Sequence, residues 1–127
     1  MKLIGLTCLL LISAWAQNVG PLEQAPAKFA NKKNPMQGNE SASRAGAKLY
    51  ARECAACHGS EGEGGEKAPP LKRAEVFQAP PGTLFWVLEN GSLNRGMPSF
   101  AHLPEPQRWQ IITYLQSQKP ADHATGK

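Results

Sequence analysis

The chain has 127 residues, which is enough for one domain with a small hydrophobic core. Hydrophobic residues make up 41% of the chain, and the formal net charge at pH 7 is +4. Three cysteines exclude a fold held together by several disulfides, and a domain with so small a core often needs another stabilising group.

Residues 1–16 have the pattern of a signal peptide. Lys2 precedes an apolar run, Leu3–Ile12, and Ala14-Trp15-Ala16 has the small-x-small pattern of a cleavage site. We expect cleavage near Ala16, which also removes Cys8, and export to the periplasm. The run is shorter than the roughly 20 apolar residues that span a bilayer, so an uncleaved leader that tethers the protein to a membrane is the alternative.

Residues 17–42 are rich in Pro, Asn, Gln, Ala and Lys, and they show no apolar periodicity. Phe29 is the only aromatic residue among them. This composition predicts a flexible linker. The alternative is a docking segment that uses three lysines, Lys28, Lys32 and Lys33.

The first strong helical pattern covers residues 44–53, with Ser41 or Ser43 as the N-cap. One face of this helix carries residues spaced four apart: Gly46, Tyr50 and Cys54. A glycine inside a helix costs about 1 kcal/mol relative to alanine, so Gly46 indicates that another backbone approaches closely there.

The helix leads into Cys54-Ala55-Ala56-Cys57-His58, the CxxCH pattern of covalent c-type haem attachment. Each thiol can form a thioether with one vinyl group of a haem, and His58 can then bind the iron as an axial ligand. The motif therefore predicts one covalently attached haem c on Cys54 and Cys57.

Two other interpretations of the motif fit the sequence less well. A thiol–disulfide redox pair usually accompanies a βαβ pattern, and nothing here alternates strand-like and helix-like segments. A structural zinc site requires four ligands, usually as two pairs, and His102 and His123 do not form a second pair. Once the leader is removed, no cysteine outside the motif remains for a structural disulfide.

The middle of the chain alternates loops with one short helix. The glycine-rich residues 59–66 predict a loop. Residues 68–71, with prolines at 69 and 70, predict a stiff extended segment that can form a wall beside the haem. A helix is predicted over 84–90, with Thr83 as its N-cap and Gly91 at its end. Because this helix is apolar on almost every side, we expect it between the haem and the rest of the core.

Met97 lies in a loop between Gly96 and Pro98, where packing on a helix does not explain a methionine. Gly96 permits a close approach, and Pro98 stiffens the chain. We expect Met97 to be the second axial ligand of the iron, with His102 as the alternative.

The last helix is predicted to begin at 103–106 and to end near Gln118, before Pro120. Its apolar stripe consists of Trp109, Ile111, Ile112, Tyr114 and Leu115. The remaining residues, 121–127, show no periodicity and are predicted to be a disordered tail.

The CxxCH motif, the later Gly-Met-Pro and a final helix with an aromatic residue together resemble the class I monohaem cytochromes c of the bacterial periplasmic type. The resemblance covers residues 43 to about 118, and we place the domain at 43–120. It implies an all-α cytochrome c fold, with three to five helices around one covalently bound haem.

The resemblance also implies roles for single residues. Gly46 and Tyr50 of the first helix would cross Ile111 and Tyr114 of the last. The carbonyl group of Pro69 would accept the ring N–H of His58, and Leu71 would pack on the haem. Candidate partners of the haem propionates are Arg73, Trp86 and Arg95.

These ligands predict a carrier of single electrons and not an enzyme. With His58 and Met97 both on the iron, no position is open to a substrate, and this ligand pair raises the reduction potential. Residues 43–127 carry ten lysines and arginines against eight acidic residues, and two ionised propionates would cancel that excess. Long-range steering of a strongly charged partner is therefore weak, and no nucleic-acid partner is expected.

The expected partners are redox proteins: a membrane complex, an oxidase or a dehydrogenase. One alternative is a haem-bearing subunit or domain partner of a periplasmic dehydrogenase or terminal oxidase complex, with residues 17–42 as its tether. Another is a haem sensor or peroxidase, in which Met97 leaves the iron.

Overall fold

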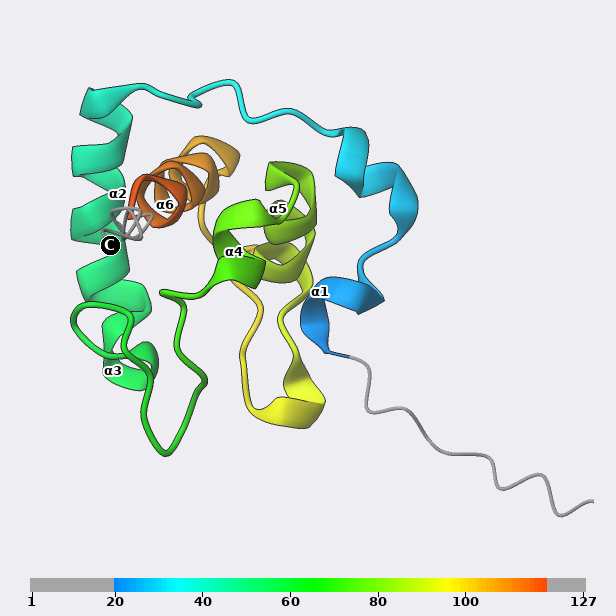
Figure 1. The fold of residues 1–127 in the computed structure, drawn as a ribbon, viewed down its shortest axis with the longest axis vertical. Helices are drawn as coiled ribbons and strands as arrows, with labels where there is room; N and C mark the ends of the chain where they lie inside the picture. The colour runs from blue at the N-terminus through cyan, green and yellow to red at the C-terminus, as the bar shows by residue number, and fades with distance from the viewer. Residues whose placement is uncertain (1–19, 119–127) are drawn as a thin grey trace, which may run out of the picture.

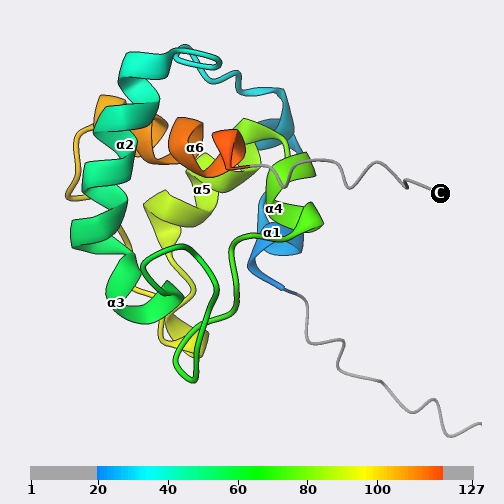
Figure 2. The same ribbon diagram turned by 60° about the vertical axis from the view of Figure 1, so that its left-hand side comes forward.

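A computed structural model describes residues 20–118, and the expected signal peptide and tail lie outside this range. The described residues form only helices, loops and one isolated β-bridge, which confirms the all-α prediction (Figures 1 and 2). They contain more helices than the three to five expected, because several are only four or five residues long. The elements in chain order are α1 (Pro21–Gln24), η1 (Ala27–Asn31), α2 (Glu40–Glu53), α3 (Ala55–His58), α4 (Ala74–Gln78), α5 (Pro81–Asn90), η2 (Leu93–Arg95) and α6 (Glu105–Ser117).

The N-cap of α2 differs from the prediction. The side chain of Asn39 accepts a hydrogen bond from the backbone N–H of Ala42 at 2.9 Å, so the helix begins before Ser41 and Ser43. Asparagine is as good an N-cap as serine, and the two serines instead lie inside the helix. The earlier start gives α2 another turn without changing the face that packs inward.

The two longest helices, α2 and α6, cross (Figure 2), and Gly46 lies where their backbones meet. A β-carbon at Gly46 would overlap the carbonyl oxygen of Gln110 and lie 2.9 Å from the β-carbon of Tyr114. The rings of Tyr50 and Tyr114 lie 5.4 Å apart one turn further along α2. The interior glycine therefore marks a close backbone approach, as predicted.

Helix α5 begins at Pro81, three residues before the predicted start. Proline is well suited to the first helical position because that residue's N–H has no helical partner. Thr83 therefore lies buried inside the first turn, and no side chain caps the helix. The predicted end is confirmed, since Gly91 follows with a φ angle of +67°.

The core lies between α2, α5 and α6. Phe85 stacks on Trp109 with ring centroids 4.3 Å apart, and Ile111 and Ile112 are fully buried. At the start of α6 the indole N–H of Trp109 donates to the carboxylate of Glu105 at 3.2 Å. That hydrogen bond, followed by the charge of nearby Lys32, lowers the pKa of Glu105.

Residues 20–39 differ most from the sequence analysis, which expected a flexible linker over 17–42. In the structure they form α1 and η1 on the side of the molecule opposite α2, and residues 32–39 then cross to the start of α2 (Figures 1 and 2). Asn34 is buried, and its side-chain amide donates to the hydroxyl group of Thr113 at 2.9 Å. The segment is held by a few separate contacts and not by an apolar stripe, so its composition gave no helical signal.

None of the helices within residues 20–118 combines the length and hydrophobicity needed to cross a bilayer.

Candidate functional site

One large cavity, of about 970 Å³, lies between the CxxCH turn, α5 and the loop that contains Met97. Ligand pockets in proteins are typically about 300–1,000 Å³, so this cavity has room for a large cofactor. The structure brings to it all six residues proposed from the sequence: Cys54, Cys57, His58, Pro69, Leu71 and Met97.

The two cysteines lie on a tight turn at the end of α2. The carbonyl group of Cys54 accepts the N–H groups of Cys57 and His58 at 3.2 and 3.0 Å, which forms the short helix α3. Cys54 is buried and Cys57 is exposed, and they form no disulfide. This turn presents both thiols and the imidazole of His58 to the same cavity.

The alternative interpretations of the motif gain no support. Burial, with smaller contributions from Glu53 and Cys57, raises the pKa of the Cys54 thiol to about 12. Reactive cysteines of redox pairs have lowered pKa values instead. Within residues 20–118, no group of three or more His, Cys, Asp or Glu side chains is placed to hold a metal ion.

The ring of His58 is held in a fixed orientation. Its Nδ1–H donates to the carbonyl oxygen of Pro69 at 2.8 Å, the contact that the family resemblance implied. Because Nδ1 carries the proton, Nε2 is the nitrogen left to bind a metal. The loop from 59 to 66 turns back to the backbone of His58, where the N–H of Gly64 donates to the carbonyl group of His58 at 2.7 Å.

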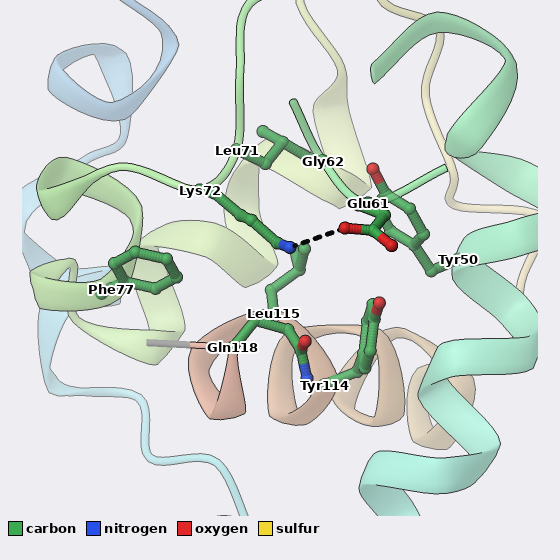
Figure 3. Close-up of a pocket in the computed structure, with 9 residues that line it drawn as sticks. All are labelled: Tyr50, Glu61, Gly62, Leu71, Lys72, Phe77, Tyr114, Leu115 and Gln118. Carbon is green, nitrogen blue, oxygen red and sulfur yellow. Dashed lines mark ion pairs between the residues drawn. The ribbon is translucent and has the colours of Figure 1, made fainter. Parts of the chain in front are cut away.

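The glycine-rich loop is fixed to α2 through Tyr50. The phenol of Tyr50 donates to the carbonyl oxygen of Gly59 at 2.7 Å, and burial raises its pKa to about 12. Figure 3 shows a small pocket beside this contact, of about 10 Å³, with the Lys72–Glu61 ion pair at its edge. That volume holds about one water molecule, so the pocket is a packing gap and not a ligand site.

The loop that carries Met97 is fixed to α5. Ser92 and Met97 exchange two backbone hydrogen bonds of 2.9 and 3.1 Å. The last carbonyl groups of α5 are satisfied from the same loop: the N–H of Phe100 donates to Leu88 at 2.7 Å, and the hydroxyl group of Ser99 donates to Glu89. These contacts place Met97 at the cavity.

The rival ligand, His102, lies elsewhere. Its side chain is 62% exposed and lies 3.9 Å from the carboxylate of Glu53. His102 is not among the residues that line the cavity. The geometry therefore favours Met97 over His102.

Two of the three propionate candidates line the cavity. Arg73 and Arg95 do, whereas Trp86 packs against Phe29 with ring centroids 6.5 Å apart. The Nε atom of Arg73 is buried and has no hydrogen-bond partner among the described residues. A guanidinium group at the wall of the cavity can form charge-assisted hydrogen bonds with a carboxylate such as a haem propionate.

The remaining walls are mostly apolar. Leu84, Val87 and Leu88 line the cavity from α5, as predicted, but Ile111 and Ile112 of α6 also line it, so α5 does not separate it from the whole core. The sequence analysis missed one part of the wall, residues 20–23. The only sequence signal there is Leu22, an apolar residue beside Pro21 at the start of α1.

Comparisons with known proteins agree with this geometry. Residues 41–115 match the family model described as cytochrome c oxidase, cbb3-type, subunit III. The fold is similar to that of cytochrome CL from the marine methylotrophic bacterium Methylophaga aminisulfidivorans MPT, with a TM-score of 0.59 and 23% identity, over 83% of this chain and 71% of that one. It is also similar to the c-type cytochrome XoxG from Methylobacterium extorquens AM1, with a TM-score of 0.53 and 25% identity, over 61% of this chain and 50% of that one. The match thus spans half the length of XoxG, and no curated protein matches the chain.

Proposed function

Because the chain belongs to the family of cytochrome c oxidase, cbb3-type, subunit III, and so carries one covalently bound haem c, we propose that it is an electron carrier with His58 and Met97 as the axial ligands. The observation that carries this proposal is the single cavity lined by both thiols, the oriented imidazole and Met97. The haem supplies reversible one-electron chemistry, which protein side chains alone lack.

The protein residues have three tasks in this function. Cys54 and Cys57 attach the cofactor, and Pro69 keeps the imidazole of His58 in one orientation. The apolar side chains of α5 exclude water from one side of the cavity. A buried environment and a methionine ligand both favour the ferrous form, so we expect a relatively high reduction potential.

The attachment of the Met97 loop argues for a carrier over a sensor or peroxidase. Those functions require Met97 to leave the iron and open a ligand position. Here the loop is held on one side by Ser92 and on the other by the end of α5. Holding the same two ligands in both oxidation states is what rapid electron exchange requires.

We also propose the cellular context that the leader predicts. Residues 1–16 would be removed near Ala16 and the domain, 43–120, would act in the periplasm with redox protein partners. The other candidate is a haem-bearing subunit of a dehydrogenase or oxidase complex, tethered by residues 17–42. Residues 20–39 pack on their own domain, which favours the free carrier.

The decisive experiment replaces Met97 by alanine in the exported holoprotein. Haem should stay attached through both thioethers, while the methionine–iron charge-transfer band disappears, the reduction potential falls and the ferrous form binds carbon monoxide. The matched control is Met36→Ala, which should keep the methionine–iron band and bind no carbon monoxide, because Met36 packs against the core but does not line the cavity. A Met97→Ala protein with an unchanged spectrum and potential would exclude Met97 as a ligand.

A further inference from the structure

The cavity has a wall that the matched family region does not contain. The family model begins at residue 41, yet Gly20, Pro21, Leu22 and Glu23 line the cavity. Leu22 is half-buried and packs against the hydrophobic core. We call residues 20–39 the N-terminal strap.

The strap is tied to α5 at a close backbone approach. A β-carbon at Gly82 would overlap the carbonyl oxygen of Phe29 and lie 2.7 Å from that of Lys32. The ring of Phe29 meets Trp86 edge-on, with centroids 6.5 Å apart. Because only a glycine leaves room for the strap here, this part of α5 is shaped to receive it.

Further contacts tie the strap to α6 and the core. Asn34 is 7% exposed, and both ends of its side-chain amide are hydrogen-bonded. The side-chain NH₂ group donates to the hydroxyl group of Thr113 at 2.9 Å, and the side-chain oxygen accepts the backbone N–H of Met36 at 2.9 Å. The ammonium group of Lys32 lies 4.3 Å from the ring centroid of Phe85 and 3.5 Å from the carboxylate of Glu105. These anchors lie away from the cavity, so the strap is held independently of what the cavity contains.

We propose that the N-terminal strap is part of the haem-binding site, with Leu22 as a haem-contact residue that excludes water from the cavity. This inference rests on the proposed placement of the haem in that cavity. An apolar wall lowers the local dielectric constant and so favours the ferrous form, which carries less charge. The strap therefore raises the reduction potential and limits the access of hydrophilic reagents.

The test places a polar side chain in the wall. Leu22→Gln should lower the midpoint potential and make reduction by a small anionic reductant, dithionite, several-fold faster. Its matched control is Ala30→Gln, which introduces the same side chain at an exposed strap position that does not line the cavity. Haem attachment and the methionine–iron band should stay intact in both proteins.

A second variant releases the strap without touching the cavity. The double change Phe29→Ala and Asn34→Ala removes two anchors, neither of which lines the cavity. We expect the same direction of change in potential, with faster hydrogen exchange confined to the strap. Potentials and reduction rates equal to those of Ala30→Gln in both variants would overturn the role of the strap while leaving the carrier function intact. A wild-type protein without the methionine–iron band would instead overturn the proposed ligand set.

Discussion

The crossing of α2 and α6 gives the sharpest prediction, which concerns Gly46→Ala. Alanine is normally the better helix former, by about 1 kcal/mol. At this position, however, the new methyl group would overlap the carbonyl oxygen of Gln110. It would also lie 2.5 Å from the carbonyl carbon of Gln110 and 2.9 Å from the β-carbon of Tyr114.

The size of the effect follows from these distances. Non-bonded carbon atoms normally lie about 3.5–4.0 Å apart, so the two helices must separate by about 1 Å. Adding a methyl group to a packed core costs about 1–3 kcal/mol, and backbone atoms on the far side put this case near the upper end. After subtracting the gain in helix propensity, about 1 kcal/mol, we expect a net destabilisation of about 2 kcal/mol.

Guanidinium unfolding of the holoprotein, followed by far-ultraviolet circular dichroism, measures this quantity. The control is Ala51→Gly, on the exposed face of α2, which should lose only the helix propensity of about 1 kcal/mol. The midpoint temperature of thermal unfolding should be about 10 °C lower for Gly46→Ala than for the wild type, because 1 kcal/mol corresponds to about 4–8 °C in a domain of this size. A Gly46→Ala protein as stable as the wild type would refute the close approach of the two backbones.

Two further predictions concern the Met97 loop and the start of α6. Gly91→Ala introduces a side chain at a φ of +67°, with its β-carbon 2.6 Å from the carbonyl carbon of Pro98, so the methionine–iron band should vanish at a lower guanidinium concentration. Gly38→Ala, at a φ of +76° in open space, is the control, and equal shifts in both variants would contradict the steric argument. The pKa of Glu105 is lower in the folded protein than its usual value of 4.5. The ionised carboxylate therefore stabilises the fold above about pH 4.5, and this stabilisation is lost as the pH falls through the folded-state pKa. Glu105→Gln should therefore flatten the acid side of the stability curve, measured by guanidinium unfolding at several pH values, whereas an unchanged acid limb would show that this carboxylate is not responsible.

The sequence motifs predicted the residues of the site more accurately than the helical patterns predicted the bounds of the surrounding helices. Cys54, Cys57 and His58 lie within one turn, so their proximity follows from sequence spacing alone. Met97 is far from them in the chain, and its place at the cavity depends on the fold, which the family match of residues 41–115 confirms as that of a c-type cytochrome. The identity of the iron ligands stays a prediction.

The incorrect predictions of the α2 N-cap and of a flexible linker share one physical cause: a local sequence pattern does not show a tertiary contact. Asn39 caps α2, but the sequence offers several polar residues just before the helix. The strap carries no periodic stripe, because it is fixed by a buried amide and by the space that Gly82 leaves. Neither contact leaves a mark in the composition of residues 20–39.

The packing of α2 on α6 sets an order of events during biogenesis. Helix α2 ends at Glu53, directly before the first thiol of the motif, and it packs against α6, which lies much later in the chain. In the folded chain Cys54 is 8% exposed and borders the cavity, so its thiol is reached from the cavity and not from the outer surface. We therefore expect haem attachment to precede the final packing of the domain, and a variant in which α2 and α6 packed together before attachment should yield less haem-bearing protein.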